Sequence, residues 1–403
     1  MNEPRTTPSA PNEAAASTPE RLRVVVVSDI HATDEPNDET NVAKENAENL
    51  QQNALTSIRP FLKDKIDKAD FLICPGDLIH QGVPAPMKWV WTELHALANE
   101  LEAELISTAG NHDLSLEPDP GRKPSSSLRE LEPGFPNASQ GSLDEYWAHG
   151  FAILDRGPCR LLVINSSDHL GGFHQGEAAH GRFGPDCERS LRERLGDADA
   201  SINICVFHHH PQEWTVDSDD RVNHMRGGDR LIEILEKRPE PWMLVHGHTH
   251  FPRLDYLGHS SGGPVRLASG SIGANLLGLS GTKVRNQMHV LEFDLVAAVV
   301  LGLRIAGRIH SYDWVSDVGW SEALPASGLA AHTTFGYRRD GYELARWLQS
   351  EAPENRKAWR WDELVDIDPR LAFLSDADRT DFFNAARRFG AGVQESIMEV
   401  TFP

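Results

Sequence analysis

Short apolar runs alternate with longer mixed segments along the chain. The apolar runs end directly in polar clusters and predict buried strands at 22–27, 71–74, 105–108, 161–165, 202–207 and 242–245. Helix-like segments lie between them, for example at 42–66, 87–101 and 187–195. Because predicted strands and helices alternate, the sequence indicates a layered α/β domain.

The pattern changes in the second half of the chain. Apolar runs at 265–268, 288–295 and 299–305 follow one another without long helices, which predicts an antiparallel stretch that completes the sheets. From residue 311 onward the sequence holds five of the ten tryptophans but only one of the 19 histidines. We therefore predict three parts, namely a tail at 1–20, a main domain at 21–310 and a mainly helical accessory segment at 311–403.

Composition disfavours two kinds of partner. The sequence has 60 Asp and Glu against 39 Lys and Arg, a net charge of −21. A surface this acidic repels phosphate backbones, so nucleic acid is an unlikely partner. The longest uncharged apolar run, 295–303, is far shorter than the roughly 18 residues expected of a membrane-spanning helix, so we expect no membrane span.

The tail and the cysteines bear on the compartment. The first twenty residues are rich in Pro, Ala, Ser, Thr and Glu and lack the apolar centre of a signal peptide, which predicts a disordered tail and a cytoplasmic protein. The four cysteines contain no CxxC pair and are too sparse for a disulfide framework, so we expect all of them to be reduced: Cys74, Cys159, Cys187 and Cys205.

Five polar clusters lie where predicted strands end, and each contains a potential metal ligand. They are Asp-Ile-His at 29–31, Gly-Asp at 76–77, Gly-Asn-His-Asp at 110–113, three histidines at 208–210 and Gly-His-Thr-His at 247–250. Residues i and i+2 of a strand share a face, so Asp29 and His31 can direct two ligand atoms at one point, as can His248 and His250. Strand ends of α/β sheets gather at one edge, so we expect the clusters to converge.

The number of ligands predicts two metal ions. The seven candidates are Asp29, His31, Asp77, Asn111, one histidine of 208–210, His248 and His250. A single transition-metal ion accepts about six ligands. A carboxylate can bridge two cations, and Asp77 has no second ligand in its own cluster, so we expect two ions to share it. Imidazole, carboxylate and amide ligands favour Mn, Fe, Zn or Ni over Mg or Ca.

The order of the clusters resembles the calcineurin-like metallophosphoesterases. The motifs of that family read D-x-H, GD, GNH[DE], H and GHxH, and all five occur here in this order, within residues 22 to about 306. The resemblance implies a four-layer α/β/β/α sandwich and a phosphoesterase whose nucleophile is a hydroxide that bridges the two metals. It implies a first ion held by Asp29, His31 and His250, a second held by Asn111, a histidine of 208–210 and His248, and Asp77 as the bridge.

The triple histidine leaves two assignments open. The family usually reads HHP or HP, so anchoring the motif on Pro211 makes His209 the ligand, which is the assignment we adopt. Counting from the preceding strand makes His208 the ligand instead, because strand alternation directs only one of the two toward the metals.

His112 is the candidate for proton transfer. It resembles the family histidine that lies beside the substrate and donates to the phosphate or protonates the leaving oxygen. Asp113 would orient it. A general acid suits a phosphodiester because the alkoxide is a poor leaving group.

We expect the chain to act on a small phosphodiester or phosphomonoester, and the sequence identifies no protein partner. One alternative is a nuclease or an effector domain of a larger assembly, since the family includes DNA-processing enzymes and the function of 311–403 is open. The other is a non-catalytic scaffold with the same fold, which the complete ligand set disfavours.

Overall fold

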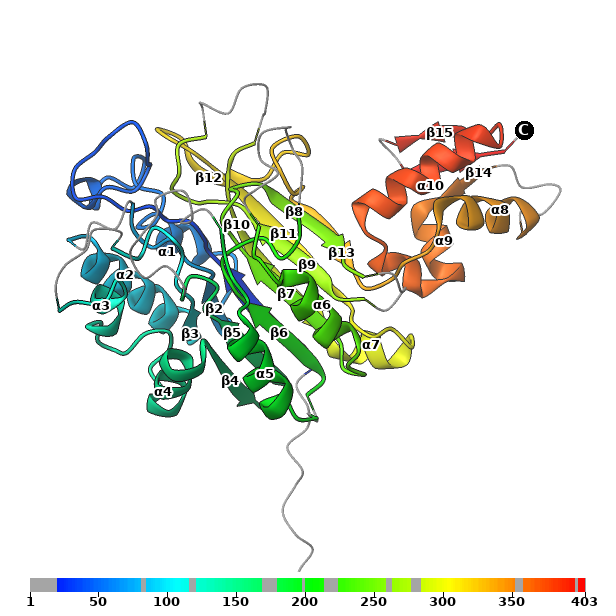
Figure 1. The fold of residues 1–403 in the computed structure, drawn as a ribbon. Coiled ribbons are helices and arrows are strands. Elements are labelled where there is room, and N and C mark those ends of the chain that lie inside the picture. The colour runs from blue at the N-terminus through cyan, green and yellow to red at the C-terminus, as the bar shows by residue number, and fades with distance from the viewer. Residues whose placement is uncertain are drawn as a thin grey trace, which may run out of the picture.

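The computed structural model (Figure 1) describes residues 20–80, 85–115, 121–168, 180–197, 200–213, 224–258, 263–276, 284–351, 358–395 and 398–402. The predicted tail at 1–20 lies almost wholly outside these residues. Among the described residues, no helix has the length and apolar character needed to cross a bilayer. The four cysteines are free thiols, as expected.

The first sheet contains seven strands in the order β12-β11-β10-β1-β2-β3, with β13 also pairing with β11. Its strands β1, β2 and β3 are parallel, whereas β10 is antiparallel to β1, β11 is antiparallel to β10, and β12 and β13 are antiparallel to β11. Their bounds are β1 (Arg21–Val26), β2 (Phe71–Cys74), β3 (Glu104–Ser107), β10 (Asn286–Asp294), β11 (Gly307–Val315), β12 (Gly319–Glu322) and β13 (His332–Phe335). The four consecutive valines that follow Arg23 are fully buried, as expected of a strand covered on both faces.

The second sheet contains six strands in the order β4-β5-β6-β7-β9-β8. The central strands β5, β6, β7 and β9 are parallel, and the two edge strands are antiparallel to their neighbours. Their bounds are β4 (Phe151–Arg156), β5 (Cys159–Ile164), β6 (Ile202–Val206), β7 (Trp242–His246), β8 (Pro252–Tyr256) and β9 (Val265–Ser269).

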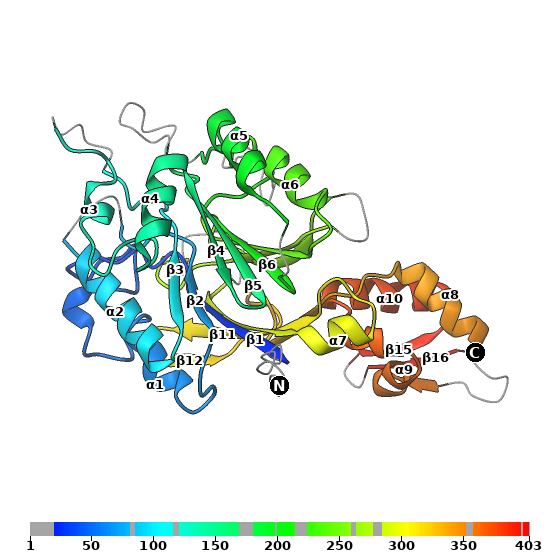
Figure 2. The ribbon, with the colours of Figure 1, turned by 90° about the horizontal axis from the view of Figure 1, so that it is seen from below.

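Helices cover the outer faces of both sheets (Figure 2), which confirms the four-layer α/β/β/α fold. On the first sheet lie α1 (Ile58–Leu62) and α2 (Met87–Glu100), and on the second lie α5 (Pro185–Arg194) and α6 (Gly228–Glu236). Leu191 and Leu231 of the latter pair pack in one buried cluster with Leu162 and Leu244 of the sheet. The structure also describes α3 (Ser126–Arg129), α4 (Gln140–His149) and α7 (Leu295–Val300) in the main domain.

Two predicted elements are wrong. The segment 42–66 forms only a 3-10 turn, η1 (Lys44–Asn46), and the short α1. The Asn53 side chain donates to the Ala43 carbonyl and accepts from the Thr56 amide, and such side-chain bonds compete with a continuous helix. The run 299–305 is not a strand, because Asp294 caps α7 by accepting from the Ala297 amide and Gly302, with a φ of 65°, follows the helix.

The predicted boundary between residues 310 and 311 falls inside β11. Strands β12 and β13 then extend the first sheet as far as Phe335. Pairing with β11 commits these residues to the main sheet whatever their composition. We therefore propose that the accessory unit begins after Phe335.

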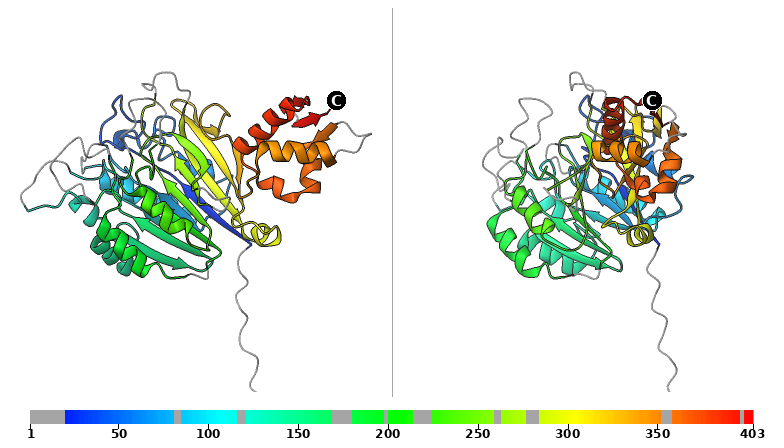
Figure 3. Two further views of the ribbon diagram at one scale, coloured as in Figure 1. Left: turned by 45° about the vertical axis from the view of Figure 1, so that its right-hand side comes forward. Right: turned by 90° about the vertical axis from the view of Figure 1, so that its right-hand side faces the viewer.

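The accessory unit (Figure 3) stands to one side of the two sheets and has its own buried cluster, which includes Leu344, Leu364 and Phe382. Its elements are α8 (Gly341–Glu351), β14 (Ala358–Arg360), α9 (Trp361–Ile367), η3 (Pro369–Phe373), α10 (Asp376–Arg388), β15 (Gly392–Gln394) and β16 (Glu399–Thr401). Its antiparallel sheet has the order β14-β16-β15. Along the chain, the unit has the order α8-β14-α9-η3-α10-β15-β16.

His289 joins the two main sheets. It lies on β10 and is fully buried, and its Nε2 donates to the Ser269 carbonyl of β9 at 2.9 Å while its Nδ1 lies 2.8 Å from the Ser311 hydroxyl. Burial lowers the pKa of His289 from 6.5 to about 4. Its neutral form therefore stabilises the fold fully above pH 6.5, and that contribution is lost as the pH falls from 6.5 through about 4.

We expect His289→Gln to lower stability at pH 7.5 and to lose less stability than the wild type on acidification. The difference between a pKa of 6.5 and one of about 4 corresponds to roughly 3 kcal/mol. Urea unfolding at pH 7.5 and pH 4.5 measures it, with His149→Gln at the end of α4 as the control. Equal acid sensitivity in wild type and His289→Gln would contradict this account.

Candidate metal centre

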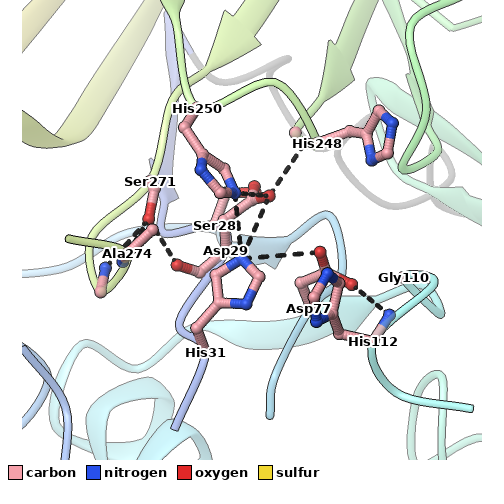
Figure 4. Close-up of polar contacts among 12 residues, drawn as sticks. Ser28, Asp29, His31, Asp77, Gly110, His112, His248, His250, Ser271 and Ala274 are labelled. Carbon is pink, nitrogen blue, oxygen red and sulfur yellow. Dashed lines mark hydrogen bonds and ion pairs between the residues drawn. The ribbon is translucent and has the colours of Figure 1, made fainter. Parts of the chain in front are cut away.

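The five clusters converge where the two sheets meet. Asp29 and His31 follow β1, Asp77 follows β2, and Asn111 follows β3. From the second sheet, residues 208–210 follow β6, and His248 and His250 follow β7. Figure 4 shows side chains of both sheets directed toward one another. The clusters therefore converge at the strand ends, as expected.

The ligand pairs lie in turns beyond the strands. Their left-handed φ values are 49° for Asp29, 48° for His31, 54° for Asp77, 82° for His248 and 58° for His250. Non-glycine residues adopt this region at a cost, and such residues concentrate at functional sites. The predicted alternation within a strand is thus not what brings each pair together; the turns do so.

Two glycines allow the clusters to approach closely. A Cβ on Gly110 would lie 2.0 Å from Asp77 Oδ1, and one on Gly247 would lie 2.1 Å from Asp29 Oδ2. Any side chain at either position would displace a carboxylate.

Asp29, His31 and His250 form one group of potential ligands. His250 Nε2 lies 3.0 Å from His31 Nε2 and 3.3 Å from Asp29 Oδ1. Asp29 is fully buried and is held by the Ser28 hydroxyl and by the His248 amide at 2.9 Å. These bonds fix the carboxylate without occupying the ring nitrogens that face it.

A second group forms around Asn111. Its Oδ1 lies 3.1 Å from His208 Nε2 and 3.1 Å from His248 Nδ1. Asp77 Oδ2 lies between the two groups, 3.2 Å from His208 Nε2 and 3.6 Å from His31 Nε2. One carboxylate oxygen therefore faces both sets.

The electrostatics of the centre link Asp77 to His208. Burial opposes ionisation of Asp77, but His208 and His112 hold the pKa of that carboxyl well below its usual range. Burial also opposes a charge on His208, yet Asp77 and Asp29 raise the pKa of that imidazole to about 9. Burial and the charge on His208 lower the pKa of His248 to about 3.

The donor set fits two cations. His208 Nδ1 lies 2.8 Å from the Pro75 carbonyl, which can only accept, so this nitrogen carries the proton of a neutral ring. The His208 Nε2 lone pair then faces the oxygens of Asp77 and Asn111, and His31 Nε2 faces His250 Nε2. Convergent lone pairs at 3–4 Å repel unless a proton or a cation lies between them, and imidazole with carboxylate suits transition metals.

The structure brings both His208 and His209 to the centre. Both are fully buried, and both belong with His248 to a group whose ligand atoms lie within 4.8 Å of one another. His209 Nδ1 lies 2.8 Å from the Ser166 hydroxyl, and the amides of His208 and His209 donate to the same hydroxyl. His210 turns away, toward the Thr249 hydroxyl and the ring of His246.

His112 and Asp113 occupy different surroundings. The His112 amide donates to Asp77 Oδ1 at 2.9 Å, and its ring lies 4.7 Å from the ring of His31. Asp113 is fully buried, and its oxygens accept from the amides of Leu78, Ile79 and Gly110. These bonds tie the loop after β2 to the loop after β3.

His80 belongs to none of the five sequence clusters, yet the fold places it beside the centre. Its ring lies 5.5 Å from that of His112 and 5.6 Å from that of His31, and its Nε2 lies 2.7 Å from a Glu39 oxygen. Its place three residues after Asp77 is the only sequence signal for this. Ser166 and Ser271, which contact His209 and the Asp29 carbonyl, carry no signal in the sequence.

The chain is similar to several known proteins. Over 241 residues the chain is 25% identical to a probable cyclic nucleotide phosphodiesterase of Rhodococcus erythropolis, covering 58% of this chain and 70% of that protein. Among solved structures, a dimetal phosphatase from Danio rerio is 11% identical, with a TM-score of 0.47, over 74% of this chain and 98% of that one. A 5'-nucleotidase from Candida albicans is 13% identical, with a TM-score of 0.36, over 73% and 52%.

The family is established by the sequence profile of the calcineurin-like phosphoesterases, which matches residues 22–252. This range contains all five clusters, including the pair Asp29 and His31 and the pair His248 and His250. The chain therefore belongs to the calcineurin-like phosphoesterase family.

Proposed function

We propose that the chain is a dinuclear metal-dependent phosphoesterase that hydrolyses a small phosphodiester, with phosphomonoesters as the second substrate class. The observation that carries the proposal is the position of Asp77 Oδ2 between His31 Nε2 and His208 Nε2, at 3.6 and 3.2 Å. A single oxygen in reach of two imidazoles from different sheets is what a bridging ligand requires. Asp29, His31 and His250 would hold one ion, and Asn111, His208 and His248 the other.

We assign His208, not His209, to the second ion. The Ser166 hydroxyl accepts two backbone amides, so its O–H is left to donate to His209 Nδ1, and a neutral His209 then keeps its proton on Nε2. His208 has the opposite tautomer, with Nδ1–H on the Pro75 carbonyl and Nε2 toward Asp77. A hydrogen bond from the other ring nitrogen commonly orients a metal-binding histidine.

Bound Mn, Fe, Zn or Ni would supply Lewis-acid activation of the phosphoryl group and of water. The net charge of −21 favours small substrates over nucleic acid. The description of the Rhodococcus relative favours a cyclic nucleotide among small diesters. A cytoplasmic setting stays a prediction.

His112 is the group we propose for proton transfer to the leaving oxygen. The hydrogen bond from its backbone amide to Asp77 holds the His112 backbone against the centre, and its ring packs beside His31. Asp113 positions His112 indirectly. It accepts hydrogen bonds from three backbone amides, and these bonds hold the loop after β2 against the loop after β3. A positioned acid contributes roughly 10²- to 10⁴-fold to such reactions.

Metal analysis tests the ligand assignment. We expect about two ions per chain after Mn or Fe loading, and loss of both in Asp77→Ala because both share that carboxylate. His208→Ala should lose one ion and regain part of its activity in excess Mn, whereas His209→Ala should keep both. Elemental analysis of matched preparations measures this, and greater metal loss in His209→Ala than in His208→Ala would reverse the assignment.

The role of His112 is tested by the leaving group. His112→Ala should retain its metals and lose activity by about 10²-fold or more on an alkyl ester, without rescue by added metal. The loss should shrink for a nitrophenyl ester, whose leaving group is stable without a proton. Equal losses on both esters would make His112 a phosphate-binding donor only.

The substrate class is tested with a panel of phosphomonoesters, phosphodiesters, cyclic nucleotides and DNA. We expect the highest kcat/KM on a small diester and at most weak, salt-sensitive DNA binding. Tight duplex binding at physiological salt, or cleavage of DNA alone, would instead support a nuclease.

A further inference from the structure

A cavity of about 260 Å³ lies between the accessory unit and the main domain, apart from the metal centre. Strand β8 begins two residues after His250 and ends at Tyr256 in the cavity wall, and five strand residues span about 16 Å. Trp242, Tyr256 and Arg304 line it from the main domain, and Tyr337, Arg338 and Arg370 line it from the chain after β13.

The wall of this cavity is cationic. It contains three arginines, and no Asp or Glu is among the described residues that line it. The chain as a whole has 60 acidic against 39 basic residues, so a wall with guanidinium groups alone runs against the composition. Such a wall attracts an anion.

Each guanidinium is held in place. Arg304 Nη2 donates to the carbonyls of residues 238, 239 and 240 at 3.0–3.1 Å. The Arg338 guanidinium lies 4.6 Å from the centre of the Tyr256 ring. Arg370 donates through Nε and Nη2 to Asp368 at 2.8 Å and lies 4.9 Å from the centre of the Tyr337 ring.

These contacts pre-organise the arginines. Asp368 lies behind Arg370, and Asp378 is close enough to Arg338 to feel its charge, but neither carboxylate is part of the wall. A guanidinium has five N–H donors, so one engaged with a carboxylate or a carbonyl still has donors for a ligand. Groups fixed before binding lose little entropy when the ligand arrives.

We propose that this junction cavity binds a small phosphate-bearing anion, either free phosphate or a small phosphate monoester. Guanidinium groups match phosphate oxygens in geometry and charge. Tyr256 and Tyr337, which also line the cavity, offer apolar surface to an organic group attached to the phosphate. Because Arg304 comes from one unit and Arg338 and Arg370 from the other, the ligand joins the two. The proposal does not depend on the catalytic function proposed above.

Calorimetric titration of the full chain, after removal of metal with a chelator, tests this site without the metal centre. The probes are inorganic phosphate and AMP, and circular dichroism confirms the fold. We expect one saturable site per chain, at least tenfold weaker in Arg338→Gln. Arg339→Gln is the matched control, because it removes the same charge one residue away and Arg339 does not line the cavity. Tighter binding of AMP than of phosphate identifies the ester as the ligand, and the reverse identifies free phosphate.

Leu303→Trp provides a second test that keeps every charge, because Leu303 also lines the cavity. The larger side chain should fill the space and abolish binding of both probes. Absence of saturable binding to the folded wild-type chain overturns the proposal. So does equal binding by Arg338→Gln and Arg339→Gln.

Discussion

The centre depends on one interaction, the approach of the buried Asp77 carboxylate to imidazoles from both sheets. Asp77 comes from the first sheet and His208 from the second, and 3.2 Å separates Oδ2 from Nε2. Charges at this distance in a buried setting are costly unless they are compensated. Two sheets can therefore hold these groups together only if a proton or a cation lies between them. The same constraint explains why the pKa of Asp77 is lowered while that of His208 is raised to about 9.

The rest of the site can be understood as support for that approach. Gly110 and Gly247 lack the side chains that would collide with the carboxylates of Asp77 and Asp29. Asp113 ties the loop after β2, which contains Asp77, to the loop after β3 through backbone amides. The left-handed φ values of Asp29 and His31 are paid for by the packing of the strands behind them. Much of the conformational cost thus lies in turns, where residues reach the centre, and the buried strands supply the stability.

The sequence was sufficient for the strands that precede the five clusters, and insufficient for what tertiary contacts decide. Each predicted cluster followed a predicted strand, because an apolar run that stops at a polar group marks a strand end. The choice between His208 and His209 rests on a carbonyl and a hydroxyl, Pro75 and Ser166, that lie far away in the chain. The segment 42–66 appeared helical, but the side-chain bonds of Asn53 override that preference locally. The composition changes near residue 311, but the first sheet continues through β12 and β13. The sequence analysis therefore placed these two strands in the accessory segment.

Helix content alone does not make the accessory unit a DNA-binding unit. DNA-binding units commonly place a helix in a groove, and α10 is the longest helix among the described residues of this unit. It begins with Asp376 and Asp378, and its Arg379 and Arg387 are already paired with Asp376 and Glu395. From residue 336 to 403 the sequence has 13 acidic and 10 basic residues, a net charge of 10 − 13 = −3. Phosphate contacts supply most of the affinity for DNA, so this surface is poorly suited to a duplex. The arginines of the unit that line a cavity, Arg338 and Arg370, face the main domain instead.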